Sequence, residues 1–304
     1  MKIYRTDELS QNILSQVSGL CAECLVYDSI TPDEVRFKIE SDPDRNTQFL
    51  LTETIESDNN ALAGFMLVVI RKRGDKNVGW LKLFAVKKEY WCKGVASRLL
   101  AAAEELVREH GVQLLRVLDS APCYFQPGIY PVYTEAVVFL QKKGFKQQGE
   151  CVHMLSDLEA LDCNTETDEL RLEKVGVKLI RASLGDKEQL IEWLKIVFPH
   201  WIPEASMGFM HKEVRVFLAK NGDGKIIGFA GYDVMKDARF GPLGVDSQYR
   251  RHGIGKVLLL KCLNEIKLMG IKSCVIPWTS AYSFYLGGCD AKIWRLFWTF
   301  AKEL

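Results

Sequence analysis

Short apolar runs alternate with longer amphipathic stretches along this chain, which predicts a mixed order of strands and helices. Strands are predicted at residues 48–54, 61–71, 79–86, 114–118, 177–181, 214–219, 226–234, 243–245, 273–276 and 293–300. Helices are predicted over most of residues 2–40 with a break at 29–34, and at 94–110, 134–143, 186–198, 253–270 and 281–286. Thr31 is the expected N-cap of the second helix, because Pro32 follows it at the first helical position. Polar turns at 57–60 and 221–224 join neighbouring strands into hairpins.

The two halves of the chain carry the same strand, loop and helix unit. Residues 82–101 (KLFAVKKEYWCKGVASRLLA) align with residues 241–260 (GPLGVDSQYRRHGIGKVLLL), which places Gly94 over Gly253 at an offset of 159 residues. The strand and the helix that follow each unit also correspond. A repeat at nearly half the chain length indicates two similar domains. We expect them at residues 1–158 and 173–304, joined by a polar, acidic linker at 159–172.

Composition limits the partners and the compartment. The 304 residues are 48% hydrophobic and 26% charged, and 40 basic against 39 acidic residues leave a net charge of +1. Such a charge gives no overall field that would favour nucleic acid or an anionic membrane. No apolar run reaches the roughly 18 residues of a membrane span, and the N-terminus lacks the apolar core of a signal peptide. We therefore expect a cytoplasmic protein.

Nine cysteines are scattered without the spacing of a disulfide framework, which fits reduced thiols in the cytoplasm. Cys21 and Cys24 form a C-x-x-C pair, but no second pair follows at zinc-finger distance and the surrounding pattern is helical. Metal or redox chemistry is therefore not expected at this pair, and no metal site is predicted elsewhere.

The junction between the apolar run that ends at Val245 and the helix that Gly253 opens has chemistry of its own. The first N–H groups of a helix have no partner within it and carry partial positive charge, so they favour a phosphate group. Arg250, Arg251 and Lys256 add cations around the same loop. Guanidinium groups match the geometry of phosphate oxygens. A pyrophosphate site is the expected result.

Two common phosphate-binding motifs are excluded at this loop. A P-loop needs Ser or Thr where Val257 stands, and a dinucleotide-binding fingerprint needs a third glycine where Leu258 stands. What remains is Arg/Gln-x-x-Gly-x-Gly/Ala after a strand and before a helix, which residues 250–255 (RRHGIG) match. On this motif and its context the sequence resembles the GNAT family of acetyl-CoA-dependent N-acetyltransferases, in a tandem two-domain form. The other interpretation is an ordinary helix start with a few basic residues.

The resemblance implies a fold class and a cofactor site. Each domain would be α/β, with a mixed, mostly antiparallel twisted sheet that is flanked by helices and splays between its fourth and fifth strands to admit the pantetheine arm of acetyl-CoA. Carried onto this sequence, the acetyl-CoA site comprises Leu243, Gly244, Val245, Arg250, Arg251, His252, Gly253, Ile254, Gly255 and Lys256. The first three would offer backbone groups to the pantetheine. The others would hold the pyrophosphate, His252 through its backbone alone.

Direct transfer from thioester to amine, the usual family mechanism, needs two proton transfers. Tyr285 stands at the family's general-acid position and would protonate the departing thiolate, a step worth roughly 10²- to 10⁴-fold. Its alternative role is a core aromatic beside Phe284. The base that deprotonates the amine is left open among Asp233, Asp246, Glu204, His200 and a chain of water molecules. A cysteine acyl-enzyme is not expected, because no Cys stands with a His in a nucleophile arrangement.

The first copy departs from the motif at two points. Trp91 stands where the second copy has Arg250, and Leu140 where it has Tyr285. The first copy also has a surplus of 14 residues around positions 122–131, rich in proline and aromatic residues. This loop either lines a substrate cleft or covers an edge of the core. We expect the first domain to be a degenerate partner and the second to be the catalyst.

The predicted function is acetyl transfer from acetyl-CoA, as co-substrate, to a primary amine of a small molecule or a peptide. The alternative is a non-catalytic acyl-CoA-binding or regulatory protein in which both copies have drifted. Near-neutral charge leaves the acceptor open among amino sugars, polyamines, aminoglycosides, free amino acids and protein N-termini. A monomer is preferred, since a tandem chain provides internally what single domains of the family achieve by dimerising.

Overall fold

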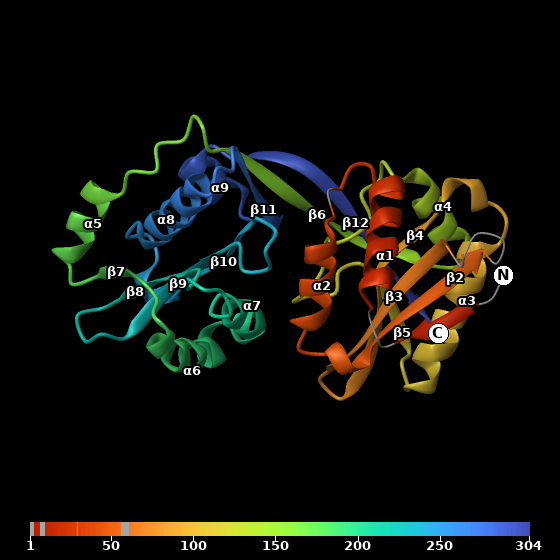
Figure 1. The fold of residues 1–304 in the computed structure, drawn as a ribbon. Coiled ribbons are helices and arrows are strands. Elements are labelled where there is room, and N and C mark those ends of the chain that lie inside the picture. The colour runs from red at the N-terminus through yellow and green to blue at the C-terminus, as the bar shows by residue number, and fades with distance from the viewer. Residues whose placement is uncertain (1–2, 7–9, 29, 56–60) are drawn as a thin grey trace. The chain divides into compact units, whose positions relative to one another are not determined.

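The computed structural model describes residues 3–6, 10–28, 30–55 and 61–304, which form two compact units (Figure 1). Unit 1 comprises Met1–Cys151 and Phe297–Leu304, and unit 2 comprises Val152–Leu296. The predicted turn at residues 57–60 lies outside the described residues. None of the described helices is long and apolar enough to cross a lipid bilayer.

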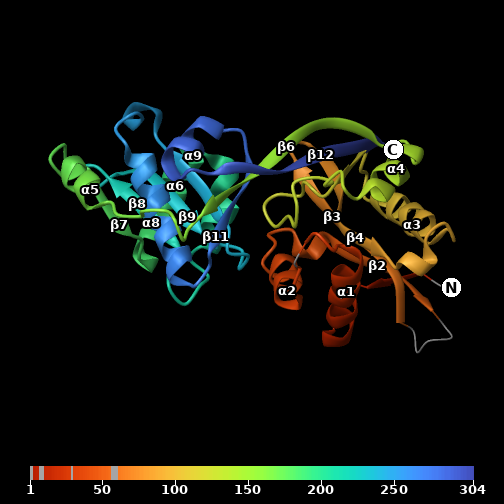
Figure 2. The same ribbon diagram turned by 90° about the horizontal axis from the view of Figure 1, so that it is seen from above.

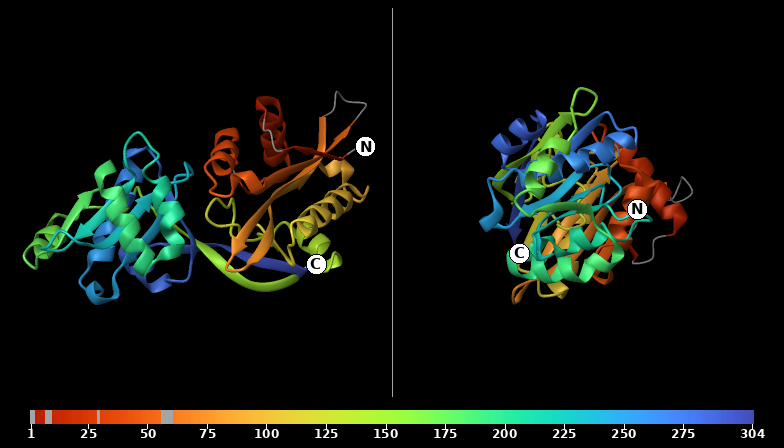
Figure 3. Two further views of the ribbon diagram at one scale, coloured as in Figure 1. Left: turned by 90° about the horizontal axis from the view of Figure 1, so that it is seen from below. Right: turned by 90° about the vertical axis from the view of Figure 1, so that its left-hand side faces the viewer.

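Unit 1 is a sheet with helices on both faces. Its strands follow the order β1-β2-β3-β4-β5, antiparallel except for the parallel pair β4 and β5. Helices α1 and α2 pack on one face, and α3 and α4 on the other (Figures 2 and 3). The elements are β1 (Ile3–Thr6), α1 (Gln11–Cys24), α2 (Pro32–Glu40), η1 (Arg45–Thr47), β2 (Gln48–Ile55), β3 (Ala61–Arg73), β4 (Lys76–Val86), η2 (Lys88–Tyr90), α3 (Val95–Glu109), β5 (Leu114–Val117) and α4 (Thr134–Lys142), with parts of β6 (Lys146–Asp157) and β12 (Lys292–Glu303).

Burial explains why the middle strand of this sheet is so apolar. Ten consecutive residues of β3, from Leu62 to Arg71, are buried. A strand covered by helices on both faces loses the alternation of apolar and polar residues. Helix α2 begins as predicted, with the Thr31 hydroxyl accepting a hydrogen bond from the N–H of Glu34 at 3.1 Å and Pro32 at its first position.

The N-terminal segment contains one strand that was not predicted. Residues 2–40 were expected to be mostly helical, but Ile3–Thr6 form strand β1, which pairs antiparallel with β2. The run IYRT is too short for a helix of its own and holds a β-branched residue at each end. The free edge of β2 therefore determines its conformation.

Unit 2 repeats this design. Strands β7 to β10 form an antiparallel sheet in the order β10-β9-β8-β7. Helices α8 and α9 lie on one side of it and α6 and α7 on the other (Figure 1). The elements are α5 (Glu166–Glu173), β7 (Lys178–Arg181), η3 (Leu184–Asp186), α6 (Lys187–Val197), η4 (Pro199–Trp201), α7 (Ile202–Met207), β8 (Val216–Lys220), β9 (Ile226–Tyr232), β10 (Phe240–Val245), η5 (Ser247–Tyr249), α8 (Ile254–Leu268), β11 (Ser273–Thr279) and α9 (Tyr282–Cys289).

The last strand of each copy pairs with a strand of the other copy. Strand β12, at the end of the second copy, pairs with β5 of unit 1, where Phe300 lies opposite Val117. Strand β6, at the end of the first copy, pairs with β11 of unit 2. The predicted domains followed chain order, whereas strand pairing groups Phe297–Leu304 with unit 1. The predicted linker at 159–172 contains most of helix α5.

Candidate acetyl-CoA site

The loop between β10 and α8 has the same backbone geometry as the loop between β4 and α3. Gly253 precedes α8 at φ +87° and ψ −3°, and Gly94 precedes α3 at φ +83° and ψ −2°. Only glycine adopts such a left-handed conformation readily. The first bond within α8 runs from Val257 N–H to the Gly253 carbonyl at 3.1 Å, so the N–H groups of residues 254–256 point out of the helix end. Each unit therefore has the backbone of an anion site.

Different side chains make the same hydrogen bond at the start of the two loops. In unit 2 the Nε of Arg250 donates to the carbonyl of Val245, the last residue of β10, at 3.0 Å. In unit 1 the indole Nε1 of Trp91 donates to the carbonyl of Val86, the last residue of β4, at 2.8 Å. Both side chains thus anchor their loop to the strand before it. Only Arg250 leaves a cation beside the loop.

A further arginine covers the glycine of unit 2. Arg171, on α5, donates to the carbonyl of His252 at 3.1 Å and pairs with Asp168 at 3.0 Å. A Cβ added to Gly253 would lie 2.7 Å from the Arg171 guanidinium. No motif marks Arg171 in the sequence, since it lies in the predicted linker and only the folding of α5 brings it to the loop.

Unit 1 has a cation in the same place from a different source. Arg98, on α3, donates to the carbonyl of Lys93 at 3.3 Å and would meet a Cβ on Gly94 at 2.7 Å. Its other nitrogen lies 2.5 Å from the carboxylate of Glu53, whose side chain is fully buried. Hydrogen bonding to Glu53 raises the pKa of Arg98. Arg98 therefore forms a structural ion pair within unit 1.

In both units the two strands beside the loop separate. Strands β4 and β5 pair only through residues 79–81 and 115–117. Within the described residues β10 pairs with β9 alone, because β11 pairs with β6 instead. Leu243, Gly244 and Val245 therefore have one backbone edge that pairs with no other described strand. This is the splay that the resemblance implied.

Aromatic rings cover Gly244 on β10. A Cβ added there would lie 2.6 Å from Phe198 Cε2 and 3.0 Å from Trp201 Cζ3, so a larger residue would collide with both rings. The two rings pack at a centroid distance of 4.8 Å. Both belong to the segment between α6 and α7, which forms a wall beside the central residue of the predicted pantetheine edge.

The other predicted cofactor residues divide into buried and exposed groups. Ile254 is buried in the core of unit 2, and Gly255 allows α8 to approach Phe284, whose ring would lie 3.4 Å from an added Cβ. Arg251, His252 and Lys256 are exposed at the loop. The His252 ring lies against its own loop, 3.3 Å from the Tyr249 carbonyl.

Tyr285 lies on α9 in apolar surroundings. Its ring packs edge-on against Phe284 and Phe240, at centroid distances of 4.9 and 6.0 Å. Burial raises the pKa of the phenol above its ordinary value of 10, and Cys289 adds to the shift. The phenol is therefore protonated at neutral pH and is chemically able to act as an acid. The corresponding Leu140 of unit 1 is fully buried in that unit's core.

The candidate bases differ in their hydrogen-bond partners and in their positions in the fold. Asp233 forms an ion pair with Arg215 and accepts a hydrogen bond from the N–H of Ala238 at 2.7 Å, which holds the turn between β9 and β10. Asp246 accepts from the N–H of Gln248 at 3.0 Å and caps η5. Glu204 and His200 flank Trp201 in α7 and η4. Only these last two stand on the segment that covers β10.

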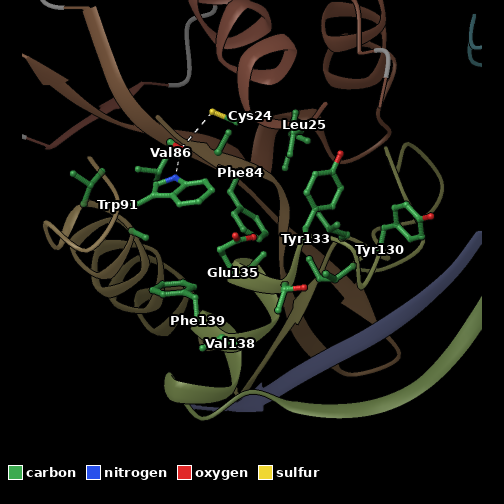
Figure 4. Close-up of a pocket in the computed structure, with 18 of the residues that line it drawn as sticks. Cys24, Leu25, Phe84, Val86, Trp91, Tyr130, Tyr133, Glu135, Val138 and Phe139 are labelled. Carbon is green, nitrogen blue, oxygen red and sulfur yellow. Dashed lines mark hydrogen bonds between the residues drawn. The ribbon is translucent and has the colours of Figure 1, made fainter. Parts of the chain in front are cut away.

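Unit 1 contains a cavity of about 610 Å³ in its own splay (Figure 4). Its walls are residues 83–86 of β4, the loop and first turn of α3, helix α4, and residues 125–130. The proline-rich loop covers the core, in which Phe125 and Ile129 are buried, and the same two residues line this cavity. The formed cavity was not predicted, because substitutions at the motif give no measure of the space behind it.

Comparison with known proteins agrees with this geometry. The acetyltransferase (GNAT) family matches at residues 17–125 and 185–287. A region of a fungal multi-domain β-N-acetylglucosaminidase, described as a GCN5-related glucosamine N-acetyltransferase, has a TM-score of 0.81 and 19% identity over 99% of this chain, which spans 38% of that protein. A tandem GNAT protein from the clavulanic acid biosynthesis pathway has a TM-score of 0.72 and 14% identity over 99% of this chain and 98% of its own.

A GCN5-related N-acetyltransferase from Sphaerobacter thermophilus has a TM-score of 0.65 and 16% identity over 99% of this chain and 95% of its own. At these identities the similarity shows a shared fold. No curated protein matches the sequence.

Proposed function

Because this chain belongs to the GNAT acetyltransferase family, we propose that it transfers an acetyl group from acetyl-CoA to a primary amine by direct attack, with catalysis in unit 2. One observation carries the choice of unit. Unit 2 contains a left-handed glycine loop with two exposed cations, Arg251 and Lys256. The same unit contains the protonated phenol of Tyr285. Unit 1 has Trp91 and Leu140 at the corresponding motif positions.

Each part of the site has a role in binding acetyl-CoA. The N–H groups of residues 254–256, with Arg250, Arg251 and Lys256, would hold the pyrophosphate. The open edge of β10 at Leu243, Gly244 and Val245 would bind the pantetheine amides and orient the thioester. The bound co-substrate supplies the activated acetyl group.

The proton transfers fall to side chains of this unit. A base removes a proton from the ammonium form of the acceptor, whose nitrogen then attacks the thioester carbon. Tyr285 donates its phenolic proton to the sulfur as the carbon–sulfur bond breaks, the attacking nitrogen releases its second proton to solvent to give the amide, and solvent reprotonates the phenolate. Glu204 and His200 are the preferred bases, because their segment covers β10.

The acceptor is a small-molecule or peptide amine. The aromatic wall of Phe198 and Trp201 offers flat apolar surfaces beside the reacting edge. Amino sugars are the first class to test, because a structural neighbour is described as a glucosamine N-acetyltransferase. The proposal includes a cytoplasmic, monomeric protein, in which the nine cysteines remain reduced.

The alternative function is acyl-CoA binding without catalysis. Unit 1 already lacks a phenol at the position of Leu140, and the alternative would require unit 2 to be inactive as well. A thiol assay separates the two functions for the whole chain. Release of CoA should require an added amine, and mass spectrometry should find the acetylated amine. The proposed enzymatic activity would be contradicted if CoA were released at the same rate with and without each amine, or if no amine caused release.

A further inference from the structure

We propose that the cavity of unit 1 is a binding site for an organic amine with an apolar body, whose ammonium group pairs with Glu135. The site is independent of which unit catalyses acetyl transfer, because all of its lining residues belong to unit 1.

The size and the lining of the cavity fit a small organic molecule. Its volume of about 610 Å³ lies inside the range of roughly 300–1,000 Å³ that is typical of small-molecule sites. Aromatic rings from four different segments line it (Figure 4): Phe84, Trp91, Tyr130, Tyr133 and Phe139. Such rings bind apolar bodies by contact, and their faces also attract cations.

A single carboxylate in this lining has no protein partner. Glu135 stands in the first turn of α4, and Figure 4 shows its carboxylate pointing into the cavity. Within the described residues it makes no hydrogen bond and no ion pair. The other acidic group, Asp28, accepts hydrogen bonds from the Tyr133 hydroxyl at 2.8 Å and from Gln126 at 2.7 Å. Glu135 is exposed, and its carboxylate is the acidic group of the lining that a ligand can reach.

The charge of the cavity favours a cation over an anion. Its lining includes the acidic Asp28 and Glu135 and a single basic residue, Lys142. Lys142 lies seven residues beyond Glu135 on α4, about 10 Å along the helix axis. At the loop, Trp91 replaces the guanidinium that Arg250 supplies in unit 2. Compared with the loop of unit 2, the loop at this cavity lacks the guanidinium of Arg250.

Glu135 has a second possible role, which the experiment must distinguish. An acidic residue in the first turn of a helix stabilises it by interacting with the helix dipole. That role requires no ligand and depends on the charge at residue 135 alone. Loss of Glu135 would then change thermal stability but would leave the relative affinities for charged and neutral ligands unchanged.

The test compares 2-phenylethylamine with 2-phenylethanol, which is similar in shape but uncharged, by calorimetry in the absence of acetyl-CoA. Because Glu135 is exposed, we expect the amine to bind about fivefold more tightly than the alcohol, as for an ion pair that solvent screens. Glu135→Gln should remove this preference and leave the alcohol's Kd within about threefold. Glu105→Gln, a matched change at an exposed residue of α3 outside the cavity lining, should retain the preference.

Trp91 reports where the amine binds. The amine should change the tryptophan fluorescence of the wild type, and this change should disappear in Trp91→Phe. Equal affinity for amine and alcohol would overturn the proposal, as would an unchanged preference in Glu135→Gln. A fluorescence change that persists in Trp91→Phe would place the amine elsewhere and would also overturn it.

Discussion

The loops at Gly94 and Gly253 have similar backbone conformations and differ in the side chains around them. The two glycines share a left-handed conformation, and Trp91 and Arg250 make equivalent hydrogen bonds to the strand before each loop. An indole N–H and a guanidinium N–H are interchangeable for that purpose, but not for binding a phosphate. A residue at this position can therefore anchor the loop without supplying a cation, as Trp91 does in unit 1.

The arginines over the two glycines show the same separation. The two arginines are similarly exposed, at 45% for Arg98 and 52% for Arg171, but Arg98 pairs with the fully buried Glu53 and Arg171 with Asp168, which is 37% exposed. A charge held by a buried partner stabilises the fold, and an exposed one remains available to a ligand. The comparison can be tested at several residues.

The largest expected effect is that of Tyr285→Phe. Removing the phenolic acid should lower kcat by about 10²- to 10⁴-fold, measured by CoA release with the best acceptor. Tyr282→Phe, at an exposed tyrosine of the same helix, should leave kcat within about twofold. Because burial raises the pKa of Tyr285 above 10 and the protonated form is the active one, this group should cause no loss of rate between neutral pH and pH 10. A Tyr285→Phe variant as active as the wild type would refute the acid assignment.

Phe300→Ala tests which unit the last strand stabilises. Phe300 is fully buried in the core of unit 1, so its truncation should cost about 3–5 kcal/mol. Hydrogen exchange should show loss of protection in α3 and β5 and unchanged protection in α8. Trp294→Ala, in the same strand at a residue 42% exposed, is the matched control. Loss of protection in α8 alone would support domains that follow chain order.

Arginine truncation should affect the two loops unequally. Arg98→Ala leaves the buried carboxylate of Glu53 without its guanidinium, but Arg98 itself is 45% exposed and solvent screens the pair, so the free energy of unfolding should fall by about 2 kcal/mol. Arg171→Ala should change it by less than about 1 kcal/mol and should weaken acetyl-CoA about fivefold. Urea unfolding and calorimetry measure these effects. Equal losses of stability would show that the two arginines have the same structural role.

Exchanging the two loop anchors is expected to have a smaller effect than truncating Arg98. Arg250→Trp should keep the hydrogen bond to Val245 and the melting temperature but should weaken acetyl-CoA by about tenfold. Trp91→Arg should leave the melting temperature unchanged and give unit 1 measurable affinity for CoA. Trp91→Leu, as a control, leaves the Val86 carbonyl without this donor and should cost about 1 kcal/mol. Unchanged CoA affinity in Arg250→Trp would show that the guanidinium has no role at the phosphate.

The features that could be predicted from the sequence are local. The helix-opening glycine with cations before it and the N-cap at Thr31 each depend on neighbouring residues. The repeat at offset 159 is found by comparing two such local patterns. Strand β1, the exchange of β6 and β12, and the position of Arg171 depend on which free edge or loop a distant segment meets. Alternating patterns identify a strand but do not specify its partner.

The central claim is that unit 2 alone binds acetyl-CoA, and calorimetry on paired glycine variants tests it most directly. Gly253 and Gly94 have similar positive φ values, and a Cβ at either would lie 2.7 Å from an arginine guanidinium. Gly253→Glu and Gly94→Glu therefore introduce similar strain and the same negative charge. We predict one acetyl-CoA site per chain, lost in Gly253→Glu and retained in Gly94→Glu. Two sites in the wild type, or one site lost only in Gly94→Glu, would contradict the claim.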